Sequence, residues 1–216
     1  MRLSPTAFNR HLAHIGQQVT WRRAYSCACR NPVSGAPDTK CPHCGGKGQL
    51  WLNPVPTVCG VASQKTQAKW AASGRWTDGD VVVTIPGDSP MWGMSQFDRV
   101  LLMNAAERFS QSLVRGAASE RLLHSVKQID RVFWLAPVTR DIVEGGIPTF
   151  DANGRLTWAS GEPPPGATYS ITGQRLPEYW CFDNLGGSRN EHSGAVLPNN
   201  VVLRRWDLWG RSSPNL

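Results

Sequence analysis

The sequence predicts a mainly β protein, an antiparallel barrel or sandwich behind a small N-terminal helix and a cysteine-rich segment. The first observation is composition: the 216 residues include 21 glycines and 16 prolines and only 18% charged residues, which suits turn-rich β structure better than a helical bundle. The second is the close spacing of short apolar stretches later in the chain, which is typical of barrels and sandwiches. The third is the clustering of four of the six cysteines within residues 27–44.

The N-terminal helix is expected over residues 5–14. Ser4 is a suitable N-cap, Pro5 fits the first helical position and Gly16 ends the segment. Apolar residues recur along it at helical spacing, namely Phe8, Leu12 and Ile15. A strand is expected next, over residues 18–25, where valine, tryptophan and tyrosine are mixed with polar residues.

The clustered cysteines form two closely spaced pairs, separated by residues 30–40, where two prolines and a glycine predict a loop. Such a loop lets the two pairs fold back together. Four thiolates at paired spacing can complete a tetrahedron around Zn²⁺, each pair supplying two corners from one tight turn. We therefore expect a zinc-knuckle subdomain with a closed structural site whose ligands are Cys27, Cys29, Cys41 and Cys44.

Other interpretations of the cysteines stay open. The thiols can be buried or exposed without any metal, and His43 or Cys59 can replace one thiolate. His43 lies between two better ligands, and Cys59 follows the breaks at Pro54 and Pro56, so neither is included in the expected site. Cys181 is most simply a strand residue.

Residues 41–48, Cys-Pro-His-Cys-Gly-Gly-Lys-Gly, resemble the Cys-x-x-Cys-x-Gly-x-Gly repeat of the DnaJ-type zinc domain. In that family the glycines let backbone amides approach the sulfurs. The first cysteine pair departs from the repeat, because a single residue separates Cys27 from Cys29 and no glycines follow. The resemblance therefore implies the ligand chemistry and not the chaperone function.

A domain boundary is expected near residue 60, since Pro54 and Pro56 interrupt the chain there. This divides the sequence into a helix and zinc-knuckle subdomain over 1–60 and a β-rich domain over 61–216. A small segment of this kind has little apolar core of its own, so metal ligation would hold it in one shape.

Strand patterns recur throughout the second domain: Val81–Ile85, Arg99–Met103, Phe109–Val114, Val126–Leu135, Leu156–Trp158, Thr168–Thr172, Glu178–Phe182 and Val201–Leu208. Residues 58–70 are ambiguous in period, 71–80 are expected to be a connection, and 113–124 admit a short helix that Gly116 weakens.

Two hairpins are expected in this domain. Asn153 and Gly154 suit the two positive φ angles of a type I′ turn. Residues 160–166 are expected to form the tip of a second hairpin that joins Trp158 to Tyr169.

The net charge of +7 is concentrated near the N-terminus. Residues 1–58 carry seven Lys and Arg side chains against Asp38 alone. With Trp21, Tyr25 and Trp51 interleaved, this segment suits contact with phosphates and bases. A solvated face or docking on an acidic protein surface explains it equally well. No apolar stretch approaches the length of a membrane helix or of a secretion signal, so no membrane partner is expected.

No catalytic motif is present: the chain lacks Gly-x-Ser-x-Gly, Gly-x-x-x-x-Gly-Lys-Ser/Thr and His-Glu-x-x-His. Isolated carboxylates lie beside turns or strand ends, where capping and solvation are ordinary roles: Asp80, Asp88, Asp98 and Asp141. We expect no enzyme. A hydrolase would need further His, Asp or Glu clustered around His124 or His192.

Three stretches match a known pattern: residues 76–90 (Trp-Thr-Asp-Gly-Asp-Val-Val-Val-Thr-Ile-Pro, then Ser-Pro), residues 154–171 (from Gly-Arg-Leu-Thr-Trp to Gly-Ala-Thr-Tyr-Ser-Ile) and residues 197–205 (Leu-Pro-Asn-Asn-Val-Val-Leu-Arg-Arg). They resemble the small neck proteins of tailed bacteriophages. In that group a Leu/Thr-Trp strand, a proline-glycine turn, a Gly-Ala-Thr-Tyr strand and a Pro-x-Tyr strand form a β-rich module. Residues 177–179, Pro-Glu-Tyr, match the last of these.

This resemblance implies a structural virion protein of the head-to-tail connector, without an active site. Several copies would form a ring between portal and tail, through whose lumen the genomic DNA passes. The implied partners are copies of itself, the portal or adaptor, and a tail or tail-completion protein. Such a protein is made in the bacterial cytoplasm, where reduced thiols favour zinc over disulfides. The rival class is a zinc-knuckle protein that binds nucleic acid.

Overall fold

The computed structural model describes residues 4–62, 64–184, 191–192 and 194–209. The protein is mainly β, with antiparallel strands, a short N-terminal helix and a closed barrel, which confirms the predicted fold class. The chain forms two compact units. The first unit combines the residues up to Asn104 with the segment that begins at Glu178, and the second is Ala105–Pro177.

The units of the structure differ from the expected division near residue 60. That position falls inside one continuous strand, β2 (Gln49–Val61), which pairs with β1 (Gln17–Ser26) and with β3 (Val81–Ile85). Strands from both sides of the expected boundary thus belong to one barrel. The reason is that an isolated two-stranded ribbon is only marginally stable, so β1 and β2 are completed by strands from later in the chain.

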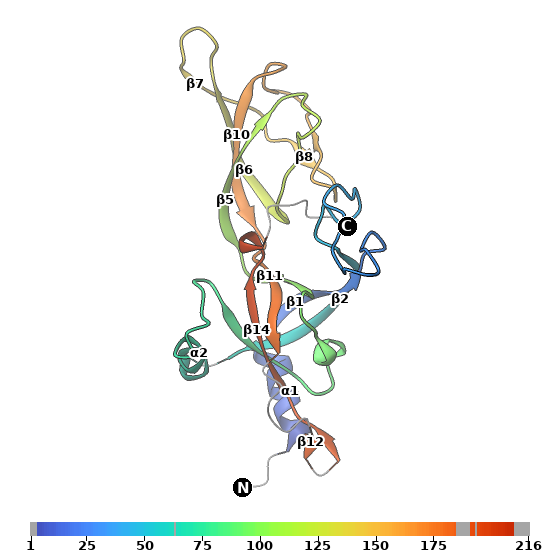
Figure 1. The fold of residues 1–216 in the computed structure, drawn as a ribbon. Helices are drawn as coiled ribbons and strands as arrows, with labels where there is room; N and C mark the ends of the chain where they lie inside the picture. The colour runs from blue at the N-terminus through green and yellow to red at the C-terminus, as the bar shows by residue number, and fades with distance from the viewer. Residues whose placement is uncertain (1–3, 63, 185–190, 193, 210–216) are drawn as a thin grey trace. The chain divides into compact units, whose positions relative to one another are not determined.

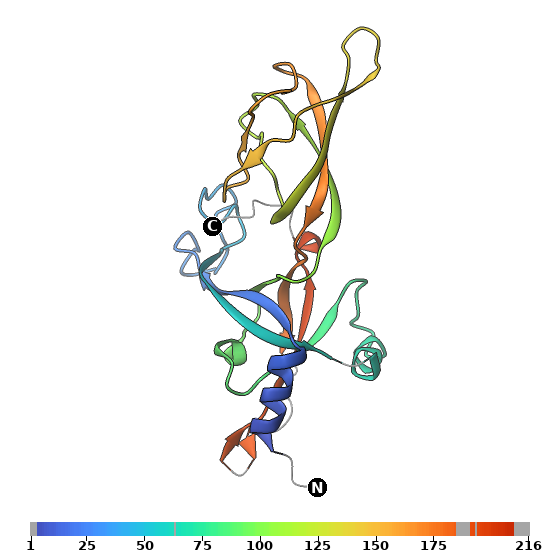
Figure 2. The ribbon, with the colours of Figure 1, turned by 180° about the vertical axis from the view of Figure 1, so that it is seen from behind.

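The barrel has six strands in the order β1-β2-β3-β14-β11-β4 and closes where β4 pairs with β1. The remaining strands are β4 (Arg99–Leu102), β11 (Glu178–Asn184) and β14 (Asn199–Arg205). Every neighbouring pair is antiparallel. Figure 1 labels most of these strands, and Figure 2 shows the β1–β2 ribbon from behind. Closure gives every strand of this sheet a partner on both sides along at least part of its length.

The barrel interior is packed with side chains. Alternate residues of the strands point inward, and the 3₁₀ turn η1 (Pro90–Gly93) adds a methionine, with another just after it. The buried cluster comprises Val19, Trp21, Cys59, Val83, Ile85, Met91, Met94, Val100, Tyr179, Cys181, Val201 and Leu203. A six-stranded barrel filled in this way has a core and no channel.

Strand β2 accommodates both prolines that were expected to end the segment. Pro56 lies opposite Thr20 of β1, while β2 meets β3 only at Gly60 and Val61. This part of β2 therefore has a strand partner on one side only, where a missing N–H is tolerated. The register of β1 and β2 also shifts near Pro54, beside Asn53 with a φ of 54°.

Helix α1 (Pro5–Ile15) forms as expected. The Ser4 side chain accepts a hydrogen bond from the N–H of Ala7, and the N–H of Gly16 donates to the Leu12 carbonyl. The buried Leu12 side chain lies over Gly60 of β2, where a Cβ would come within 2.5 Å of Leu12 Cδ2. Glycine at this point lets the helix pack directly on the barrel.

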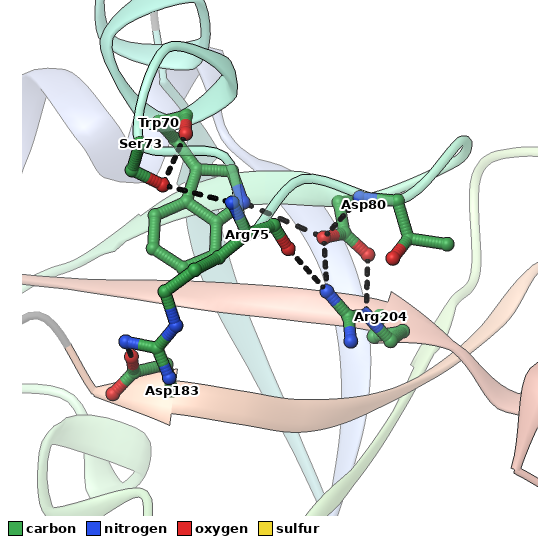
Figure 3. Close-up of polar contacts among 7 residues, drawn as sticks. Trp70, Ser73, Arg75, Asp80, Asp183 and Arg204 are labelled. Atoms are coloured by element: carbon green, nitrogen blue, oxygen red, sulfur yellow. Dashed lines mark hydrogen bonds and ion pairs between the residues drawn. The ribbon is translucent and has the colours of Figure 1, made fainter.

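Helix α2 (Gln64–Ala71) occupies part of the stretch with ambiguous period and is fixed by a polar network around Asp80 (Figure 3). Arg204 of β14 donates to both Asp80 carboxylate oxygens at 2.9 and 2.8 Å, and the Trp70 indole N–H of α2 points to the same group at 3.4 Å. Arg204 also donates to the Arg75 carbonyl, and Arg75 pairs with Asp183 of β11 at 3.0 Å. The helix and its connection are thus tied to two barrel strands.

The second unit is built on a four-stranded antiparallel sheet in the order β5-β10-β6-β7. Its strands are β5 (Glu107–Val114), β6 (Val126–Leu135), β7 (Ile142–Glu144) and β10 (Thr168–Arg175), with the small pair β8 (Thr149–Phe150) and β9 (Leu156–Thr157) beside them. The core of this unit lies on one face of the sheet and comprises Phe109, Leu113, Leu122, Ile129, Val132, Tyr169 and Ile171.

Several local predictions need correction. The hairpin at Asn153-Gly154 is confirmed, yet only Gly154 has a positive φ, because the Asp151 side chain accepts the N–H of Asn153 and shapes a different turn. Residues 160–166 do not form a hairpin tip, since β9 pairs with β8 whereas β10 pairs with β5 and β6.

Two further boundaries differ from expectation. No helix forms over 113–124, where β5 runs to Val114 and turns follow. The last strand, β14, ends at Arg205, and a 3₁₀ turn, η2 (Trp206–Leu208), follows it. The first unit also contains a small antiparallel strand pair, β12 (Glu191–His192) and β13 (Ala195–Val196). Within the described residues, none of the helices is long and apolar enough to cross a membrane.

Candidate metal centre

The four predicted cysteines lie in the loop that connects β1 to β2, and we call residues 27–48 the cysteine knuckle. β1 ends at Ser26, β2 begins at Gln49, and these two residues are paired. The Cys27 N–H donates to the Gly48 carbonyl at 2.9 Å, which continues the ladder by one step. The knuckle is therefore an insertion at the end of a barrel hairpin (Figure 1).

The four sulfur atoms converge. All lie within 4.8 Å of one another, with Cys27 Sγ and Cys41 Sγ 3.8 Å apart and Cys29 Sγ and Cys44 Sγ 3.5 Å apart. Sulfurs at the corners of a tetrahedron about 2.3 Å from a central zinc ion are roughly 3.8 Å apart. None of the six cysteines forms a disulfide. The four thiols thus form a set that can hold one metal ion.

Tight turns place the second pair. The Gly45 N–H donates to the Cys41 carbonyl at 2.9 Å, and the Gly48 N–H donates to Cys44 Sγ at 3.2 Å. Gly46 and Gly48 have positive φ angles, and a Cβ on either would come within 2.9 Å of Thr39 or of Arg30 and Pro37, respectively. The glycines of the repeat therefore serve both the turn and the approach of an amide to sulfur.

The thiols differ in acidity. The backbone N–H of Cys44 and, to a smaller extent, that of His43 outweigh the effect of burial and lower the pKa of Cys41 to about 6. Burial raises the pKa of Cys29 to about 12, and the neighbouring thiols add to this rise. Because a metal binds thiolates, loading the site releases the remaining thiol protons.

The two alternative ligands, His43 and Cys59, are not part of the four-sulfur cluster. His43 is exposed on the turn between Cys41 and Cys44. Cys59 and Cys181 are fully buried in the barrel core, where burial raises the pKa of each thiol to about 12. Both behave as small apolar residues, as was expected for Cys181.

The knuckle rests on an aromatic cluster of the barrel. The Lys47 ammonium lies over the Trp206 ring, 5.0 Å from its centroid. Trp206 in turn packs against Trp51 with ring centroids 5.0 Å apart, and the Arg99 guanidinium stacks over Trp206 at 3.9 Å. Arg99 and Glu178 form a buried ion pair beneath them, their side chains 2% and 9% exposed. Burial and the nearby Arg99 charge lower the pKa of Lys47.

Some basic side chains of the N-terminal segment make intramolecular contacts. Arg30 donates to the Gly48 and Gly35 carbonyls at 2.8 and 3.1 Å, which fixes the knuckle loop, and Lys47 covers the tryptophan. Arg10, Arg23 and Lys40 remain on the surface.

Elsewhere, two of the four carboxylates noted in the sequence, Asp80 and Asp98, have structural partners. Asp98 is fully buried and accepts hydrogen bonds from the N–H groups of Ala24 and Ser95 and from the Trp21 indole, which join β1 to the turn before β4. Asp80 is held by Arg204. His124 packs against Phe109 with ring centroids 5.9 Å apart. In the described part of the chain, the four cysteines are the one group of three or more His, Cys, Asp or Glu arranged to hold a metal.

Comparison of the chain with protein-family models and with curated proteins finds no match. The geometry alone therefore indicates the role of the site. Sequence reasoning found the four clustered cysteines through their spacing. It missed the Arg99–Glu178 ion pair and the cation–π contact of Lys47 with Trp206, because these contacts join residues far apart in the chain and have no local pattern.

Proposed function

We propose that this chain is a structural protein in which the cysteine knuckle holds one zinc ion, and that it is a subunit of the head-to-tail connector of a tailed bacteriophage. The observation that carries the structural role is the convergence of four cysteine sulfurs, all within 4.8 Å of one another. A tetrahedral site filled by four protein thiolates has no open position for a substrate or a reactive water.

Zinc is the metal that fits this donor set best. Four soft thiolates in a tetrahedral arrangement are typical of structural zinc, whereas calcium and magnesium need oxygen ligands. Three of the four cysteines are buried, and the Gly48 N–H reaches one sulfur. In the reducing bacterial cytoplasm the thiols stay available for metal.

The barrel supports an assembly role. Its interior is filled by apolar side chains, so the fold offers a rigid body for docking. The three stretches that resemble phage neck proteins coincide with ordered strands, including β3, β10 and β14. We propose that copies of the chain form a ring in the virion neck, contact the portal or adaptor and a tail or tail-completion protein, and surround the passing genomic DNA.

Native mass spectrometry of the purified protein tests both parts of the proposal, because one spectrum reports bound metal and subunit number. We expect a mass increment of one zinc per chain and a closed oligomer, or a zinc-loaded monomer that forms rings when portal is added. Cys44→Ser should lose the zinc. Cys59→Ala, which removes a thiol from the barrel core, should keep it.

Addition of portal or of duplex DNA to the same protein distinguishes the connector from the rival class, a zinc-knuckle protein that binds nucleic acid. A zinc-loaded monomer that ignores portal and binds duplex DNA with strong salt dependence would replace the connector with a nucleic-acid-binding role. A chain that carries no metal when purified from zinc-supplemented cells would overturn the zinc site.

A further inference from the structure

The second unit contains a pocket of about 320 Å³ between the turn at residues 116–121 and the beginning of β9. Its wall combines the small residues Gly116, Ala117 and Ala118 with Leu156, the carboxylate residue Glu120 and the two arginines Arg121 and Arg155. Small residues leave room for a ligand, and the volume is at the lower end of small-molecule sites. This pocket is separate from the cysteine knuckle and its role does not depend on the proposed function.

The two arginines of the pocket are direct neighbours. Arg121 and Arg155 form an antiparallel bridge, and residues paired in this way have Cβ atoms about 5 Å apart on one face. Both residues are exposed. Within the described residues, neither guanidinium has an ion pair or a side-chain hydrogen bond. Like charges placed directly opposite each other are unfavourable, so a bound anion would relieve a repulsion that the fold leaves uncompensated.

The acidic groups nearby already have other partners. Glu120 accepts hydrogen bonds from the Tyr169 hydroxyl at 2.6 Å, from the Gly116 N–H at 2.7 Å and from Arg115 at 3.2 Å. Burial acts to raise the pKa of Glu120, but these hydrogen bonds outweigh it and lower the pKa below its ordinary value. Glu120 is therefore ionised, and its ion-pair partner Arg115 also contacts Glu162, at 2.6 Å.

Asp151, the acidic residue of the adjoining turn, also has hydrogen-bond partners. Asp151 Oδ1 accepts the backbone N–H groups of Asn153 and Arg155 at 2.8 and 2.9 Å, which shapes the β8–β9 hairpin. Within the described residues, neither carboxylate forms an ion pair with Arg121 or Arg155.

We propose that this pocket binds a phosphate group through Arg121 and Arg155. Each guanidinium presents a planar fork of N–H donors that matches the oxygens of a phosphate, and two such forks on one face can hold one group from two sides. A phosphate monoester carries close to two negative charges near neutral pH and so matches two arginines better than a single carboxylate does. The phosphate can belong to a free phosphorylated molecule or to a nucleic-acid backbone.

Isothermal titration of the full-length protein with inorganic phosphate, at low and at raised ionic strength, tests the proposal. We expect saturable binding of one phosphate per chain. Arg121→Gln and Arg155→Gln should each raise the dissociation constant at least tenfold, since each removes charge-assisted hydrogen bonds. Arg121→Lys should have an intermediate effect, because it keeps the charge and loses the fork.

Arg108→Gln is the matched control. Arg108 is an exposed arginine of β5 in the same unit and outside the pocket, so this variant loses the same charge and should change the dissociation constant less than twofold. Equal weakening by all three glutamine variants would show general charge attraction and overturn the site. Absence of saturable binding in the wild type would do the same.

Further titrations identify the source of the phosphate. Tighter binding of a nucleoside monophosphate than of a short oligonucleotide with unphosphorylated ends would assign the pocket to a free phosphorylated molecule, and the reverse order would assign it to a phosphodiester backbone. Stronger binding of an acidic peptide than of either, lost in Arg121→Gln, would overturn the assignment to phosphate in favour of a protein carboxylate.

Discussion

The cysteine knuckle and the barrel use the same amino acid in opposite ways. In the knuckle, cysteines are themselves the buried cluster, and no large apolar core surrounds them. In the barrel, Cys59 and Cys181 are two members of a twelve-residue apolar core and contribute as small hydrophobic side chains. The surroundings of a thiol thus decide its role: the barrel thiols pack as apolar residues, and we propose that metal ligation supplies the stability of the knuckle, where apolar packing is absent.

The largest expected effect is loss of the metal. Cys29→Ser and Cys44→Ser should each abolish metal binding and leave the knuckle without fixed structure, because structural zinc contributes on the order of 10 kcal/mol in zinc-finger peptides. Amides of residues 27–48 should then exchange rapidly with solvent while those of β3 and β14 stay protected. Hydrogen–deuterium exchange with mass spectrometry measures both regions in one experiment.

The control for this prediction is Cys59→Ala, which should retain the metal and reduce the stability of the barrel by about 1 to 2 kcal/mol through a small cavity. If Cys44→Ser unfolded the knuckle and the barrel together, the two regions would not be held by separate means and the comparison would be wrong.

The buried ion pair beneath the knuckle should have the next largest effect. Arg99→Met leaves the Glu178 carboxylate buried without its partner, which should lower the free energy of unfolding by about 3 to 5 kcal/mol. Urea unfolding followed by tryptophan fluorescence measures the change. Arg131→Met breaks the pair with Glu144, whose side chains are 57% and 60% exposed, and should cost less than about 1 kcal/mol. Equal losses in the two variants would contradict the role assigned to burial.

Disturbing the close packing of α1 on the barrel should have a smaller effect on the free energy of unfolding. Gly60→Ala places a Cβ 2.5 Å from Leu12 Cδ2, so the helix must shift, at a cost of about 1 to 3 kcal/mol. Gly93→Ala adds the same methyl group where no heavy atom lies within 4 Å and should be almost neutral. The thermal unfolding temperatures of the two variants are compared. An unchanged unfolding temperature for Gly60→Ala would mean that α1 does not pack closely on β2.

The smallest expected effect concerns the acid stability of the second unit, which has neither a closed barrel nor a cysteine knuckle. The hydrogen bonds from Tyr169, Gly116 and Arg115 outweigh burial and lower the pKa of Glu120 below its ordinary value of 4.5. A depressed carboxyl pKa contributes stability above the unfolded pKa and loses it as pH falls through the folded pKa. Stability should therefore decline below about pH 4.5.

Glu120→Gln should flatten this acid dependence, whereas Glu162→Gln, with a side chain 56% exposed, should preserve it. The urea midpoint measured from pH 3 to pH 6 distinguishes the variants. Identical acid profiles for Glu120→Gln and the wild type would remove Glu120 as the cause.

Local elements could be predicted from the sequence because their signals are local. The cap at Ser4, the valine run of β3 and the strand pattern over residues 126–135 each predicted an element within a residue or two of its bounds. The convergence of the four cysteines was likewise predicted, since the loop between the two closely spaced pairs can bring them together.

Pairings between distant segments could not be predicted. The closure of the barrel depends on β1 meeting β4 and β4 meeting β11, and no periodicity reports these contacts. For the same reason Pro54 and Pro56 were interpreted as a boundary, although they occupy a length of β2 whose outer side has no strand partner. The pairing of Arg121 with Arg155 also arises only in the folded unit.

The pairing of Ser26 with Gln49 makes the knuckle an exchangeable module. Both ends of the insertion leave the barrel from adjacent positions of one antiparallel ladder, so a two-residue Asn-Gly turn can replace residues 27–48 without altering the register of β1 and β2. Conversely, the entropic cost of a connecting loop grows only slowly with its length. The hairpin can therefore accept other inserts at this place, and the barrel provides a scaffold on which the whole loop can be replaced as a unit.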